Sequence, residues 1–125
     1  MSAFPLRVAH IDDDEDLRAI VRLALQVTGG CAVESFESGQ RALERIPDFH
    51  PDVILIDVLM PGMSGVDTVC ALRERMDLSD VAVVFATGLD EAQSRDFEAA
   101  GACAVIRKPF DAMKLAGQLQ QICRR

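Results

Sequence analysis

The chain has 125 residues, half of them apolar and about a quarter charged, which is the balance of a folded domain rather than of a disordered chain. A chain of this length can bury a core without disulfides or a structural metal. Twenty acidic and 13 basic residues give a formal net charge of −7. This sign works against direct nucleic-acid binding, which relies on Lys and Arg to neutralise phosphates. We therefore expect one domain, residues 1–125, without direct binding to DNA or RNA, and the charge does not work against a protein partner.

The cysteines and the apolar runs indicate the compartment. No C-x-x-C pair is present and neither histidine lies near a cysteine in sequence, so a zinc site is not expected. Each cysteine falls in or beside an apolar stretch, which predicts buried reduced thiols and a cytoplasmic protein. The four are Cys31, Cys70, Cys103 and Cys123. The N-terminus does not resemble a signal peptide, and no run approaches the roughly 20 apolar residues of a membrane helix.

The first part of the chain predicts two strands, each followed by a helix. The apolar run Leu6–Ile11 predicts a buried strand, and helical spacing then begins at Asp14 and stops at Gly29-Gly30. The apolar face of this helix is expected to consist of Leu17, Ile20, Val21, Ala24 and Leu25. Cys31–Phe36 alternates like a strand. The next helix opens at Ser38-Gly39 and is expected to end at Pro47.

The rest of the chain continues the alternation. Val53–Ile56 is rich in β-branched residues, as in a strand buried on both faces of a parallel sheet. The remaining predicted elements, in chain order, are a helix at about Val66–Met76, a strand at Val81–Phe85, a helix at roughly Glu91–Ala100, a strand at Cys103–Ile106 and a helix at Ala112–Cys123. Five strand–helix units predict an α/β fold: a doubly wound, five-stranded parallel sheet with five helices.

Charged and polar side chains follow four of the five predicted strands. They are Asp12-Asp13, Asp57, Thr87 and Lys108. Ligands of such sheets bind at the carboxyl ends of the strands, so these side chains are expected to converge. Carboxylates held close together repel one another unless a cation lies between them. A hard divalent cation with oxygen ligands meets that need, so the acidic cluster predicts an Mg²⁺ site open to phosphate.

The same residues resemble the response regulator receiver family of two-component signalling, to which the chemotaxis regulators belong. The resemblance rests on the acidic pair, on Asp57 within D-V-L-M-P-G-M-S-G, on Thr87 within F-A-T-G and on Lys108 within K-P-F. It covers nearly the whole chain and implies a flavodoxin-like receiver fold. It also implies that a sensor histidine kinase or a histidine phosphotransfer protein donates a phosphoryl group to Asp57.

The resemblance implies a role for each matching residue. Asp57 is the nucleophile, and it ligates Mg²⁺ together with Asp13 and the main-chain carbonyl of Leu59. Asp12 acts largely through metal-bound water, Lys108 pairs with one phosphoryl oxygen, and the Thr87 hydroxyl bonds another. Pro109 fixes the turn after Lys108 through a cis peptide. The domain is then not an enzyme for another substrate, because it catalyses only its own phosphorylation and autodephosphorylation.

Output is implied to pass to a downstream protein through the surface of the fourth helix, fifth strand and fifth helix. At one position the chain departs from the family, because Val105 stands where an aromatic residue normally swings inward. Leu59 and Leu89 flank the expected path of attacking water, which predicts a long-lived aspartyl phosphate. His10 is expected to be a satisfied core histidine rather than a catalytic group.

Three other functions fit the sequence less well. A phosphatase of the haloacid-dehalogenase class carries its nucleophile in D-x-D-x-T/V after the first strand, whereas here Asp12-Asp13-Asp14 lacks the following Thr or Val. A flavin-binding domain needs a phosphate-cradling loop after that strand, where this chain has acids. A receiver-like module that is never phosphorylated remains open because of Val105.

Overall fold

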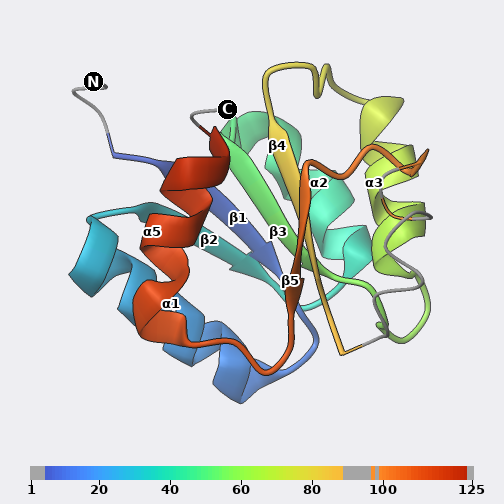
Figure 1. The fold of residues 1–125 in the computed structure, drawn as a ribbon. Helices are drawn as coiled ribbons and strands as arrows, with labels where there is room; N and C mark the ends of the chain where they lie inside the picture. Colours follow the sequence, from blue (N-terminus) through green and yellow to red (C-terminus); the bar gives the residue numbers. More distant parts are fainter. Residues whose placement is uncertain (1–4, 89–96, 98, 124–125) are drawn as a thin grey trace.

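One parallel five-stranded sheet organises the chain in the computed structural model, which describes residues 5–88, 97 and 99–123. The strands are β1 (Arg7–Ile11), β2 (Ala32–Phe36), β3 (Val53–Asp57), β4 (Ala82–Thr87) and β5 (Ala104–Arg107). Their spatial order is β2-β1-β3-β4-β5, so the chain moves to one side of β1 and then returns to build the sheet on the other (Figure 1). The reversal lies between β1 and β3, which is where doubly wound sheets bind ligands.

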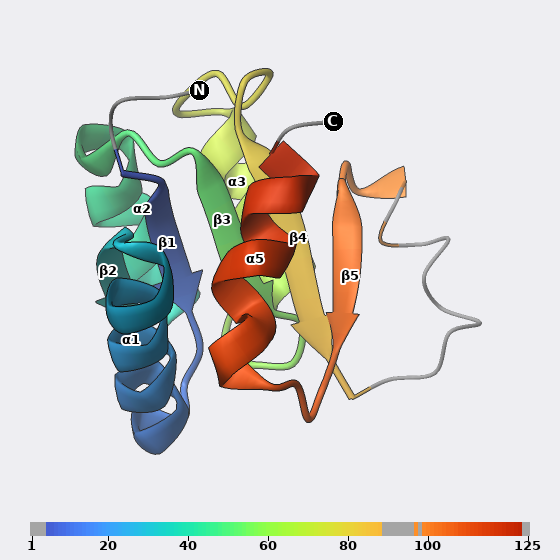
Figure 2. The same ribbon diagram turned by 60° about the vertical axis from the view of Figure 1, so that its left-hand side comes forward.

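Helices cover both faces of this sheet, as Figures 1 and 2 show. The four helices within the described residues are α1 (Glu15–Gly29), α2 (Gly39–Phe49), α3 (Gly65–Arg73) and α5 (Ala112–Cys123). α1 and α5 pack together on one face, and α2 and α3 on the other. The predicted doubly wound α/β fold is confirmed. Most of the predicted fourth helix, Glu91–Ala100, lies outside the described residues; from it, Phe97 packs against Phe85 with ring centroids 5.4 Å apart.

Alternate side chains of the central strands point to opposite faces of the sheet and contribute to two hydrophobic cores. Ile54 and Ile56 of β3 face α2 and α3, whereas Val53 and Leu55 face α1 and α5. All four are fully buried, which explains why this segment reads as a continuous apolar run. The strand ends are thereby held in fixed positions, and the polar residues that follow them are placed at one edge.

Capping residues fix where the helices begin. The side chains of Asp14, Ser38 and Ser64 accept hydrogen bonds from main-chain N–H groups in the first turns of α1, α2 and α3. The predicted end of α2 at Pro47 is wrong, because the helix continues to Phe49. Proline removes one N–H from the ladder, yet the last turn still closes through the bond from His50 N–H to the Ile46 carbonyl.

Two other predictions about the helices are corrected. α3 ends at Arg73 rather than near Met76, although Met76 still packs against the core. Ile20 was placed on the buried face of α1 but is 54% exposed, because the sheet covers only the stripe of Val21, Ala24 and Leu25.

The thiols also depart from expectation. Only Cys31 of the four cysteines is buried, and the other three are exposed. An apolar neighbour in sequence does not bury a residue when that residue lies at the end of an element or on its outer face. Separately, none of the described helices is long and apolar enough to cross a bilayer.

Candidate phosphoacceptor site

Three carboxylates meet at the carboxyl ends of β1 and β3. Asp12 and Asp13 directly follow β1, and Asp57 is the last residue of β3. One oxygen from each of the three lies within 4.8 Å of the others. Asp12 and Asp57 are buried, whereas Asp13 is exposed, so the cluster has a covered floor and one open side. The structure thus brings together the acidic residues that the sequence placed at two separate strand ends.

Lys108 is the cation of this cluster. It follows β5, and its Nζ lies 2.7 Å from Asp12 Oδ2 and 3.4 Å from Asp57 Oδ1. Its main-chain N–H donates to the Thr87 carbonyl at 2.8 Å, which ties the end of β4 to the segment after β5. The Lys108–Pro109 peptide is cis. One ammonium therefore bridges the carboxylates of two neighbouring strands.

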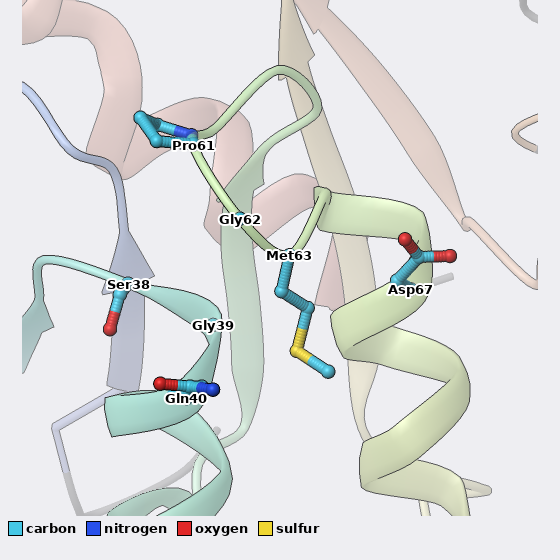
Figure 3. Close-up of a pocket in the computed structure, with 7 residues that line it drawn as sticks. All are labelled: Ser38, Gly39, Gln40, Pro61, Gly62, Met63 and Asp67. Carbon is cyan, nitrogen blue, oxygen red and sulfur yellow. The ribbon is translucent and has the colours of Figure 1, made fainter.

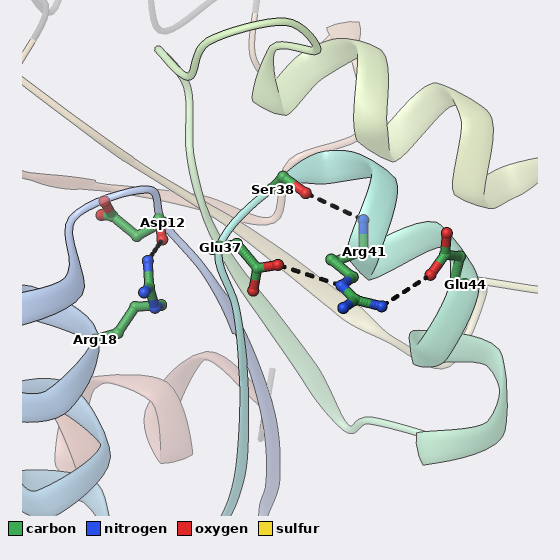
Figure 4. A network of polar contacts seen from close by, with 6 residues as sticks. All are labelled: Asp12, Arg18, Glu37, Ser38, Arg41 and Glu44. Atoms are coloured by element: carbon green, nitrogen blue, oxygen red, sulfur yellow. Dashed lines mark hydrogen bonds and ion pairs between the residues drawn. The ribbon is translucent and has the colours of Figure 1, made fainter.

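Asp12 is held at each of its polar atoms. Its N–H donates to the Phe36 carbonyl at 3.1 Å, and its own carbonyl accepts from Arg18 Nη1 at 2.7 Å (Figure 4). Its Oδ1 accepts from the Asp14 N–H at 2.9 Å, and its Oδ2 accepts from Lys108. No comparable bond engages the Asp13 carboxylate among the contacts of the described residues. Asp12 is therefore held in one position in the site, whereas the Asp13 carboxylate is available to bind a ligand.

The pKa values of Asp57 and Lys108 are each set by opposing effects of burial and of neighbouring charges. Burial raises the pKa of Asp57, and Asp12 and Asp13 raise it further, against the lowering effect of Lys108. Burial works to lower the pKa of Lys108, but the hydrogen bond and charge of Asp12 and the charge of Asp57 outweigh it and raise the pKa. The positive charge of Lys108 is thereby secured, while the negative charge on Asp57 lacks full compensation.

The donor set fits a hard divalent cation. All three clustered side chains offer carboxylate oxygens, and one ammonium does not neutralise three carboxylates. Mg²⁺ is typically held by one or two carboxylates while it keeps water and phosphate oxygens in its shell, which suits a site with an open side. The two other predicted residues border the site: Thr87 is buried at the end of β4, and Leu59 is 64% exposed two residues beyond Asp57.

Sequence reasoning missed two residues that shape the site. Gly65 opens α3 against the main chain of Asp57, and a Cβ there would lie 2.3 Å from the Asp57 carbonyl oxygen. The only signal was a glycine at the start of a helix, after a loop that contains Pro61 and Gly62. No sequence pattern points to Arg18, because its contact with Asp12 depends on how α1 is oriented relative to the end of β1.

His10 is buried as predicted, but it is not satisfied. Its Nδ1 has no hydrogen-bond partner, and neither has the hydroxyl of Ser35, the residue paired with it on β2. Burial lowers the pKa of His10 to about 4, so the imidazole is neutral near pH 7. These properties argue against a catalytic role for His10.

A separate hollow of about 430 Å³ lies between the starts of α2 and α3 (Figure 3). It does not contain the acidic cluster. Gly39 lines it, and a Cβ at that position would lie 2.2 Å from the Thr68 hydroxyl. The full lining is Ser38, Gly39, Gln40, Pro61, Gly62, Met63 and Asp67. Its mixed lining holds no buried polar group without a partner, and it indicates no ligand.

Comparison with known proteins agrees with this architecture. The chain is 31% identical over 122 residues to the response regulator MprA of Mycolicibacterium vanbaalenii, covering 97% of this chain and 52% of that protein. It is 31% identical over 117 residues to the phosphate regulon transcriptional regulatory protein PhoB of Pseudomonas aeruginosa, covering 92% of this chain and 50% of PhoB. The chain thus spans about half the length of the curated relatives that it matches.

Solved structures show the same fold. The chemotaxis response regulator CheY4 of Vibrio cholerae superposes with a TM-score of 0.87 at 29% identity, over 95% of this chain and 99% of that one. The BeF3-activated receiver domain of DrrB superposes with a TM-score of 0.82 at 25% identity, over 98% and 100% of the two chains. Residues 8–120 match the family described as the response regulator receiver domain. On this match, and with the fold and acidic cluster described above, the chain belongs to the response regulator receiver family.

Proposed function

We propose that this domain takes a phosphoryl group onto Asp57 in an Mg²⁺-dependent reaction and passes the signal on by changing conformation. The observation that carries the proposal is the convergence of Asp12, Asp13, Asp57 and Lys108 at the point where the strand order reverses. Phosphoryl transfer depends mainly on positioning and on neutralising oxygen charge. A buried carboxylate beside two further acids and one ammonium has the parts needed for that chemistry.

The proposed donor is a phosphohistidine on a sensor histidine kinase or a histidine phosphotransfer protein. An Asp57 carboxylate oxygen attacks the phosphorus, the P–N bond breaks, and its electron pair returns to the imidazole nitrogen. The product is an aspartyl phosphate, a mixed anhydride of the Asp57 carboxyl group and phosphate. We propose that the domain catalyses only this self-phosphorylation and its reversal by water.

Each neighbour of Asp57 has a proposed part in the step. Asp13 and the Leu59 carbonyl join Asp57 in holding Mg²⁺, and Asp12 acts through water. When bound, Mg²⁺ would supply positive charge that offsets the repulsion between the carboxylates and a phosphoryl group. Lys108, already 3.4 Å from Asp57, stabilises negative charge that builds up on a phosphoryl oxygen. The Thr87 hydroxyl donates a hydrogen bond to another phosphoryl oxygen.

The proposed output surface includes β5 and α5. Val105 of β5 is partly buried and packs against the core on the α2–α3 side. A valine cannot make the ring swing of an aromatic residue, so we propose that Thr87 communicates with this surface through smaller shifts. Val105→Tyr is then expected to change binding of the downstream protein more than phosphorylation, and an equal loss of both would contradict this.

The direct test is incubation with acetyl phosphate and Mg²⁺ followed by intact-mass measurement. We expect a gain of one phosphoryl group that disappears with EDTA and in the Asp57→Asn variant. A gain that persists in Asp57→Asn would place the phosphoryl group elsewhere. No gain under any condition would favour a receiver-like module that binds its partner without phosphorylation.

A further inference from the structure

Arg18 reaches back from α1 to the site without belonging to the acidic cluster. It lies at the end of the first turn of α1, and its Nη1 donates to the Asp12 carbonyl at 2.7 Å (Figure 4). This single bond spans the entire turn between β1 and α1. On the basis of the proposed function, we propose that Arg18 is a positioning residue that sets the Asp12–Asp13 peptide and thereby the place of the Asp13 carboxylate relative to Asp57.

The planar peptide bond between Asp12 and Asp13 links the Arg18 contact to Asp13. The Asp12 carbonyl belongs to the same rigid plane as the Asp13 N–H, so turning the carbonyl also turns that N–H and changes the backbone dihedrals that place the Asp13 side chain. Asp12 is almost fully buried, and without Arg18 its carbonyl loses the donor that satisfies it. The peptide would then turn toward water to recover a partner. Because nothing else fixes the Asp13 carboxylate among the described contacts, this turn displaces the more exposed of the proposed metal ligands.

Charge alone predicts the opposite effect, which makes the proposal testable. Arg18 is a cation close to the site, so its removal would strengthen the attraction of the acids for a divalent cation. Positioning predicts that its removal weakens cation binding. Loss of a group that orients metal ligands typically lowers metal affinity by about 10- to 100-fold, and we expect the lower end because Arg18 acts on a main-chain carbonyl.

The same helix offers a matched control. Arg22 lies one turn further along α1, and its Nη2 donates to the Val33 carbonyl of β2 at 3.2 Å. Arg22→Met therefore removes the same charge and the same type of bond, from an arginine to a main-chain carbonyl, but away from the acidic cluster. Arg18→Lys keeps the charge at position 18 while it replaces the planar fork with an ammonium.

The test is isothermal titration of Mg²⁺ into the full chain at neutral pH, for wild type, Arg18→Met, Arg18→Lys and Arg22→Met, with thermal unfolding as a check on folding. We expect about tenfold weaker binding in Arg18→Met, intermediate binding in Arg18→Lys and wild-type binding in Arg22→Met. Phosphorylation of Arg18→Met by acetyl phosphate should recover at saturating Mg²⁺, because only occupancy of the site is impaired.

Unchanged or tighter Mg²⁺ binding in Arg18→Met, or an equal loss in Arg22→Met, would overturn the proposal. If Arg18→Met does not fold, Arg18→Lys decides: weaker binding supports the proposal, and unchanged or tighter binding overturns it. If the wild-type chain binds Mg²⁺ and the Arg18 variants bind it equally well, the positioning role of Arg18 is refuted but the proposed function is not. A wild-type chain that binds no Mg²⁺ refutes the proposed function as well.

Discussion

The Asp57→Asn substitution should stabilise the domain when no divalent cation is present. Burial and two neighbouring carboxylates raise the pKa of Asp57 in the folded state. A carboxylate with a raised folded pKa lowers stability at pH values above that pKa, and the penalty fades as pH falls and the group is protonated. A neutral amide of nearly the same shape removes the penalty at neutral pH.

The size of the expected stabilisation can be estimated from the charges around Asp57 and from its burial. At an effective dielectric constant of about 20, two unit charges 4.8 Å apart repel by about 3.5 kcal/mol, and Asp57 lies within that distance of each of its acidic neighbours. Lys108 at 3.4 Å attracts by about 5 kcal/mol on the same scale. Because water screens the share of the exposed Asp13, the attraction of Lys108 largely offsets these repulsions, and the burial of the charged carboxylate decides the sign. We therefore expect Asp57→Asn to raise the free energy of unfolding by about 1–3 kcal/mol.

The assay is urea unfolding in EDTA at pH 7, followed by circular dichroism because the chain has no Trp or Tyr. The gain in Asp57→Asn should shrink as the pH is lowered. Mg²⁺ at about 100 times its dissociation constant should stabilise wild type by about 2.7 kcal/mol and Asp57→Asn by much less. A variant less stable than wild type in EDTA would refute the electrostatic reasoning.

Three further predictions follow from named contacts. Lys108→Met should retain or tighten Mg²⁺ binding, because a competing cation is lost, yet slow phosphorylation by acetyl phosphate about 100-fold or more; unchanged phosphorylation rates would contradict its role. Gly65→Ala should destabilise the domain by about 1–3 kcal/mol in urea unfolding, because its Cβ would meet the Asp57 carbonyl. Gly117→Ala on α5 is the control, since its Cβ meets nothing within 4 Å, and it should gain about 0.5–1 kcal/mol. Leu59→Asn should shorten the lifetime of the phosphorylated state measured by the decay of its mass, and an unchanged lifetime would remove Leu59 from the path of water.

The strand ends were predictable because parallel sheets impose a simple rule. Runs such as Val53–Ile56 are buried on both faces, and the residue after each run must emerge at the carboxyl edge. Asp57 and Lys108 are far apart in sequence, but this rule alone brings them to one edge. The resemblance to receivers then assigned roles that the sheet by itself does not.

What the sequence could not predict depends on contacts between elements. Ile20 satisfies the helical spacing of a buried residue, but the position of α1 against the sheet leaves it exposed. Pro47 is a helix breaker by rule, yet one lost N–H in a last turn is tolerated. Arg18 and Gly65 act on main-chain atoms of Asp12 and Asp57, and no side-chain pattern encodes such contacts.

The central claim is that Asp57 is the phosphoacceptor, and the most direct measurement locates the modified residue. The phosphorylated chain is reduced with borohydride, which converts an aspartyl phosphate to homoserine, and is then sequenced by tandem mass spectrometry. The proposed chemistry predicts homoserine at position 57 alone, and only in samples that contained Mg²⁺. Homoserine at position 12 or 13, or none at all in a sample that had gained phosphoryl mass, would contradict it.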